Sequence, residues 1–154
     1  MNQKNMKKET CKNCVLVFGT FDIFHAGHVA FLREARSLGD AVVVNLAQDI
    51  VVQELKGEPP LHSWEERAQV LRQSGLVSEI FPGDKTRGMF SQIIAVKPSL
   101  IAFGYDQIRL KEAVDAWIKR YAFTIPTMTI GAYKPDKYKS SILRASYDRS
   151  QTTP

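Results

Sequence analysis

The sequence is poor in cysteine and has no long apolar run. Cys11 and Cys14 are the only two cysteines among 154 residues, and a single CxxC pair is half of a tetrahedral zinc site. We interpret both as reduced thiols near the start of the chain, in a reducing compartment. No apolar stretch approaches the roughly 18 to 20 residues of a membrane span, and the first residues lack the apolar core of a secretory signal. We therefore expect a cytoplasmic protein without membrane contact.

Basic charge is concentrated at the N-terminus rather than along a stripe. Lys4, Lys7, Lys8 and Lys12 against Glu9 give the first fourteen residues a charge of +3, out of +5 for the whole chain. No arginine-rich run or basic run with interleaved aromatic residues accompanies this tail. The pattern disfavours a nucleic-acid partner and suits a polyanionic small ligand.

Length and composition predict one folded domain. The chain is 44% hydrophobic and 24% charged, which is ordinary for a globular protein, and its length is typical of a single domain. We predict a flexible basic tail over residues 1–14, one domain over 15–147 and a polar tail over 148–154.

Apolar runs alternate with helical patterns along this domain. Strands are predicted at 15–18, 41–47, 77–81, 100–103 and 124–130, and helices between 25 and 38 and at 63–73, 89–96, 108–121 and 142–146. Ser63 and Glu66 have the spacing of a capping box at the start of the second helix. The alternation predicts an α/β, Rossmann-like domain, with a five-stranded parallel sheet, helices on both faces and the first strand in the centre.

Residues suited to phosphate chemistry gather in the turn after the first strand. The turn contains Gly19, Thr20, Phe21, Asp22, His25, Ala26, Gly27 and His28. Glycine allows the backbone to approach phosphate closely, and the amides at the start of a helix favour an anion. Two imidazoles three residues apart face roughly the same way and can donate to one phosphate. A metal pair lacking further ligands is the alternative for HxxH, and no GxGxxG or GxxxxGK[ST] motif is present. We predict that this turn binds a triphosphate.

Two more segments follow predicted strands. Gly104 to Gln107 follow the fourth strand, and Ser140 and Ser141 follow the fifth, after a loop containing Lys134, Lys137 and Lys139. Ligands of parallel sheets sit beyond the carboxyl ends of the strands, so these segments should meet the histidine turn at one edge. The serines can cap the last helix and offer hydroxyls and amides to phosphates. The alternatives are a simple turn glycine at Gly104 and a solvated lysine loop.

The segment GTFDIFHAGH at residues 19–28 resembles the GxFDxxHxGH signature of the cytidylyltransferase-like family of nucleotidyltransferases. The similarity extends through LREARSLGD, Lys56, the helix start at Glu66 and Arg67, and the SSI segment. It implies that His25 and His28 hold the triphosphate and stabilise the transition state at the α-phosphorus. It also implies that Thr20 and Phe21 lie against the nucleotide, and that Mg²⁺ accompanies the phosphates without a site made by protein alone. Phosphate or acceptor contacts are further implied for Asp22, Lys56 and Arg67, although Lys56 or Arg67 alone would more often be a surface charge.

The motif GYDQ at Gly104 to Gln107 is similar to the corresponding segment of archaeal-type FAD synthases, which adenylylate FMN, as is the paired serine. Under this resemblance Asp106 contacts the nucleotide. Glycerol-3-phosphate cytidylyltransferases instead carry RTxGISTT, where this chain reads KPDKYKSSILR. The resemblance implies ATP or CTP as the donor and FMN as the acceptor. The alternatives are a cytidylyltransferase for a small phosphate ester such as glycerol 3-phosphate, and a nucleotide-binding module without turnover. Members of the family often pair, which implies a homodimer.

Overall fold

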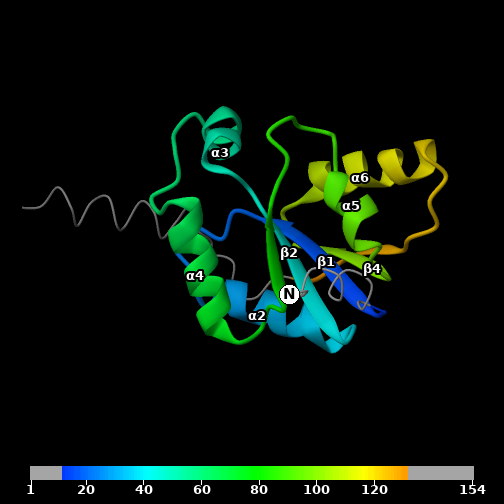
Figure 1. Ribbon diagram of the computed structural model, residues 1–154, viewed down its shortest axis with the longest axis horizontal. Helices are drawn as coiled ribbons and strands as arrows, with labels where there is room; N and C mark the ends of the chain where they lie inside the picture. The colour runs from blue at the N-terminus through cyan, green and yellow to red at the C-terminus, as the bar shows by residue number, and fades with distance from the viewer. Residues whose placement is uncertain (1–11, 132–154) are drawn as a thin grey trace, which may run out of the picture.

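The fold is built on a five-stranded sheet in which every pair of neighbours is parallel (Figure 1). A computed structural model describes residues 12–131. The strands are β1 (Cys14–Gly19), β2 (Ala41–Leu46), β3 (Glu79–Pro82), β4 (Leu100–Phe103) and β5 (Thr127–Thr129). Their order is β3-β2-β1-β4-β5, so the first strand is central. The predicted fold class and the central first strand are both confirmed.

Helices cover both faces of the sheet. They are α2 (Ala26–Ser37), α3 (Asp49–Lys56), α4 (Trp64–Ser74), α5 (Ser91–Val96) and α6 (Ile108–Arg120). Helices α2 and α4 lie on one side of the strands, and α5 and α6 lie on the other (Figure 1). Within residues 12–131, no helix is long and apolar enough to cross a membrane.

Each face of the sheet has its own apolar core, because successive strand residues point to opposite sides. Val15, Val17, Val42, Val44 and Leu46 face α2 and α4. Leu16, Phe18, Val43, Ile101 and Phe103 face α5 and α6. Since β1 and β2 are buried on both faces, they read as nearly continuous apolar runs in the sequence.

The element boundaries differ from the predicted ones in a few places. Strand β3 begins at Glu79 rather than 77, β5 spans only Thr127–Thr129, and α5 begins at Ser91. Helix α3 was not predicted. It ends at Lys56, and its C-cap Gly57 has a φ of 83°, which suits glycine. The capping box of Ser63 and Glu66 is confirmed, with both of its hydrogen bonds present. The predicted helix at 142–146 lies outside the described residues.

The state of Cys14 differs from the one predicted from the sequence. Cys14 is fully buried at the start of β1 and forms a disulfide. The expectation of a reduced thiol is therefore wrong for Cys14. Cys11 lies outside the described residues.

Candidate active site

His25 and His28 form a closely packed pair where β1 passes into α2. Their ring centroids are 3.8 Å apart and the planes are inclined by 25°. His25 is the N-cap of α2, and its Nδ1 accepts the Gly27 N–H at 3.0 Å. His28 completes a capping box, because its Nδ1 accepts the His25 N–H at 3.2 Å. The expectation that the two rings face the same way is confirmed.

These hydrogen bonds determine which nitrogen of each ring carries the proton. Burial first, and then the nearby charges of His25 and Lys56, lower the pKa of His28 to about 3. Burial also lowers the pKa of His25. Near neutral pH both rings are therefore uncharged, and because Nδ1 is an acceptor in each, the proton resides on Nε2. The pair thus presents two N–H donors, which suits stabilisation of phosphate charge.

Two phenylalanine rings pack against the His28 ring. Phe21 meets the His28 ring edge-on at 5.1 Å between centroids, and Phe24 stacks on it at 5.4 Å. Phe21 is buried and has a φ of 52°. A Cβ on Gly19 would lie 2.5 Å from the Phe21 ring. Glycine at position 19 is therefore required by the packing of Phe21, a reason that the sequence pattern does not reveal.

Asp22 joins the histidine turn to the segment between α3 and α4. Its carboxylate is buried and accepts the backbone N–H groups of Leu61 and His62 at 2.7 and 3.1 Å. The two amides come from residues about forty positions later in the chain. Asp22 therefore fixes the position of a second loop beside the turn, and direct contact with a substrate stays a prediction.

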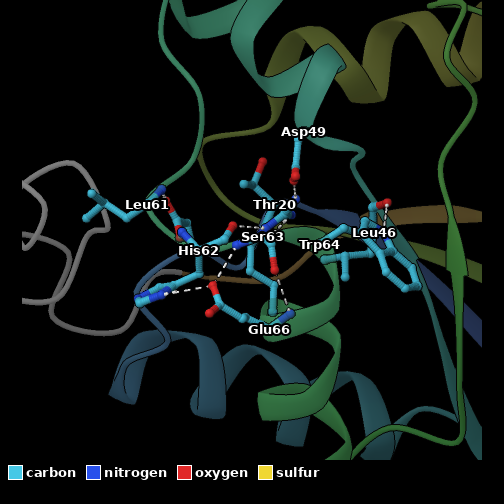
Figure 2. A network of polar contacts seen from close by, with 10 residues as sticks. Thr20, Leu46, Asp49, Leu61, His62, Ser63, Trp64 and Glu66 are labelled. Carbon is cyan, nitrogen blue, oxygen red and sulfur yellow. Dashed lines mark hydrogen bonds and ion pairs between the residues drawn. The ribbon is translucent and has the colours of Figure 1, made fainter.

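Arg67 is fully buried and binds three separate segments. Figure 2 shows residues of these segments, Thr20, Asp49 and His62, in one network of polar contacts. Its guanidinium donates to the carbonyl of Thr20 at 2.8 Å and to that of His62 at 3.0 Å. It also pairs with Asp49, at the start of α3, at 2.5 Å. These donors are directed at protein groups, so the geometry gives Arg67 a positioning role behind the turn. The phosphate contact implied by the resemblance has no support in this geometry and stays untested.

Gln107 connects the histidine turn to the motif after β4. Its Oε1 accepts the Gly104 N–H at 2.8 Å, and its Nε2 donates to the Phe18 carbonyl at 2.9 Å. The ends of β1 and β4 are thereby held together, and the predicted meeting of these two segments at one edge is confirmed. Asp106 is exposed beside Gly104. Its contact with a nucleotide, like the contacts of Ala26 and Gly27, stays a prediction.

The remaining predicted residues differ in how the structure places them. Lys56 is exposed in the last turn of α3, and its charge acts on His28, so it lies within electrostatic reach of the pair. Ser140 and Ser141 lie outside the described residues.

Sequence reasoning missed three polar residues around this edge of the sheet. Asp49 was overlooked because α3 was not predicted, and Gln107 was treated only as part of a motif. Asn45 is the one polar residue in the apolar run AVVVNLA at 41–47, which is the signal that could have singled it out.

The chain is similar to known proteins in both sequence and fold. The family described as cytidylyltransferase-like matches residues 16–146. An FAD synthase of Thermococcus sibiricus is 38% identical over 128 residues, covering 82% of this chain and 86% of that protein. An FAD synthase of Pyrococcus horikoshii is 37% identical with the same coverage. The crystal structure of a lipopolysaccharide core biosynthesis protein from Thermoplasma volcanium superposes with a TM-score of 0.72 at 30% identity, over 79% of this chain and 98% of that one.

Proposed function

The chain belongs to the cytidylyltransferase-like family of nucleotidyltransferases, and on that premise we propose that it transfers AMP from ATP to FMN, forming FAD and pyrophosphate. The FAD synthases of Thermococcus sibiricus and Pyrococcus horikoshii support this choice, because they match most of the chain. The chain in turn covers most of each relative, so the similarity is not confined to one motif.

The observation that carries the proposal is the orientation of His25 and His28. Each Nδ1 accepts a backbone N–H, so each neutral ring directs its N–H donor through Nε2. Both donors come from the turn at the carboxyl end of the central strand, where ligands of open parallel sheets bind. Two fixed donors at the start of a helix, where the helix dipole also favours an anion, are suited to an α-phosphate whose negative charge increases during transfer.

The reaction is a direct displacement at phosphorus. A phosphate oxygen of FMN forms a bond to the α-phosphorus of ATP, and the bond from that phosphorus to the bridging oxygen of the β-phosphate breaks. That oxygen leaves with the electron pair as pyrophosphate. The attacking phosphate is already ionised, so no strong general base is needed. The protein contributes by aligning the two substrates and by hydrogen-bonding the developing charge.

Mg²⁺ belongs to the proposal as a companion of the triphosphate. Within residues 12–131, no group of three or more histidine, cysteine or acidic side chains is arranged to hold a metal. Phosphate oxygens and water would then supply most of its ligands, which suits Mg²⁺. When bound, it neutralises charge on the phosphates.

The test of the proposal is a matrix of donors and acceptors. The purified chain is given ATP or CTP with FMN or glycerol 3-phosphate, and pyrophosphate release is measured. We expect release with ATP and FMN, accompanied by FAD. Release only with CTP and glycerol 3-phosphate would replace this assignment by the cytidylyltransferase alternative. No release with any pair, together with tight nucleotide binding, would favour a module without turnover.

The proposal also includes a cytoplasmic location and a homodimer, both expected from the sequence and its resemblance. We do not propose a nucleic-acid partner. Deletion of residues 1–12 should remove any binding of nucleic acid and leave pyrophosphate release unchanged.

A further inference from the structure

Asn45 is a buried carboxamide at the carboxyl edge of the sheet. It is the second-to-last residue of β2 and is only 7% exposed. Val42, Val44 and Leu46 face α2 and α4, so strand alternation directs Asn45 to the opposite face, toward α5 and α6. A polar side chain in this position interrupts an otherwise apolar strand.

Two other carboxamide side chains at this edge, those of Gln107 and Gln48, form hydrogen bonds within residues 12–131, whereas that of Asn45 forms none there. Gln107 joins the ends of β1 and β4, and Gln48 donates to the Gly83 carbonyl at 2.6 Å. The described residues supply no hydrogen bond to the Asn45 side chain. Buried polar groups are nearly always hydrogen-bonded, and one without a protein partner calls for an explanation.

The surroundings of Asn45 are aromatic and closely fitted. In the strand register it lies between Phe18 of β1 and Phe81 of β3. Its Oδ1 occupies the space beside Gly83, where a Cβ would approach to 2.6 Å. Gly83 is the first residue after β3, and the exposed segment 85–89 follows it. Asn45 therefore lies close to an exposed segment at the carboxyl edge of the sheet.

The position of Asn45 relative to the histidine turn indicates which substrate it meets. The turn follows β1, and the motif expected to contact the nucleotide follows β4, on one side of β1. Strands β2 and β3 lie on the other side. Under the proposed function the α-phosphate lies over β1 and the nucleotide base toward β4, which leaves the β2 and β3 side for the acceptor.

We propose that Asn45 is a specificity-determining residue that reads the hydrogen-bonding edge of the acceptor's ring. A carboxamide pairs a donor with an acceptor, and this matches the imide edge of a flavin, in which N3–H adjoins two carbonyl groups. Oδ1 accepts from N3–H while Nδ2 donates to a neighbouring carbonyl. Aromatic residues flanking one such polar group suit a planar ring, as in many ligand sites. This inference rests on the proposed function, because it takes FMN as the acceptor.

The experiment compares FMN with N3-methyl-FMN as acceptors, using the wild type, Asn45→Leu and Asn45→Ser. We expect methylation to lower wild-type kcat/KM by roughly tenfold to a hundredfold, because the buried carboxamide is then left unpaired. In both variants FMN should fall to about the level of its methylated analogue, with the KM for ATP unchanged. Val43→Ala is the matched control, since Val43 is buried on the same face of β2. That control should lose stability and keep the discrimination.

The possible failures are distinguishable. If the wild type forms FAD but accepts both flavins equally well, the role of Asn45 is wrong and the proposed function stands. The same conclusion follows if either variant folds and still discriminates as the wild type does. If the wild type forms no FAD from FMN, the proposed function is wrong, and so is the proposed contact between Asn45 and the flavin ring. Asn45→Ser and the wild-type comparison keep the test decisive if Asn45→Leu does not fold.

Discussion

His25 and His28 cap helix α2 with the same pair of rings that the proposed function uses as hydrogen-bond donors. Their centroids are 3.8 Å apart, and each Nδ1 accepts a backbone N–H at the helix start. The cap uses Nδ1, whereas the proposed chemistry uses Nε2. Structural and chemical roles are therefore assigned to different atoms of each ring and can be separated by substitution.

The first prediction separates these roles at His28. His28→Gln keeps an acceptor at the third helical position, which glutamine can supply in a capping box, whereas His28→Ala removes it. His28→Ala should lower kcat by roughly a hundredfold to a thousandfold, because it removes one donor to the transition state. His28→Gln should lower kcat by less, because its amide group keeps an N–H donor. Only the alanine variant should also lose about 1 kcal/mol of unfolding free energy.

The matched control is Glu66→Ala, which removes the same arm of the capping box at α4. It should lower stability by a similar amount and leave kcat near the wild-type value. Steady-state kinetics and urea unfolding give both quantities. A His28→Ala enzyme that folds and keeps wild-type kcat would show that His28 is only a helix cap.

The second prediction concerns pH. In the folded chain burial, together with the nearby charges of His25 and Lys56, lowers the pKa of His28 to about 3, whereas the unfolded value is about 6.5. Between these values the unfolded state binds more protons, so the free energy of unfolding should fall as pH decreases from about 6.5 toward 3. His28→Gln should make this slope shallower. Urea unfolding of both proteins between pH 4 and 7 measures it, and identical slopes would show that His28 protonates normally in the folded state.

The third prediction concerns the buried arginine. Arg67→Leu leaves the carbonyls of Thr20 and His62 without their donors, so we expect a loss of about 2 to 4 kcal/mol of unfolding free energy. Asp49→Asn should cost under about 1 kcal/mol, because the Asp49 side chain is 48% exposed. Thermal and chemical unfolding compare the two. Equal effects of both substitutions would mean that the ion pair, rather than the carbonyl contacts, gives Arg67 its importance.

The fourth prediction tests the packing of Gly19 against Phe21. Gly19→Ala introduces a Cβ 2.5 Å from the Phe21 ring, so it should cost about 1 to 3 kcal/mol. In a Phe21→Leu background the same change should cost less, since the ring is gone. A double-mutant cycle measures this coupling. Gly131→Ala, which meets nothing within 4 Å, should be neutral, and additive costs at positions 19 and 21 would refute the contact.

The parts of this molecule that were predictable from sequence are those with local causes. The apolar runs of β1 and β2 and the capping box of Ser63 and Glu66 are readable because burial on both faces and helix capping depend on nearby residues. Helix α3 escaped prediction because its eight residues give barely two turns of pattern. The role of Arg67 could not be predicted, since its partners at Thr20 and Asp49 lie 47 and 18 positions away. Likewise, nothing local to Gly19 shows that a ring two residues later folds back over it.

The central claim is that this chain moves AMP from ATP to the phosphate of FMN in one direct step. The most direct measurement gives the purified protein FMN, Mg²⁺ and ATP labelled in the α-phosphate, and follows the label. The account predicts labelled FAD, one pyrophosphate for each FAD formed, and no label on the protein. Absence of labelled FAD, or label bound covalently to the protein as an intermediate, would contradict it.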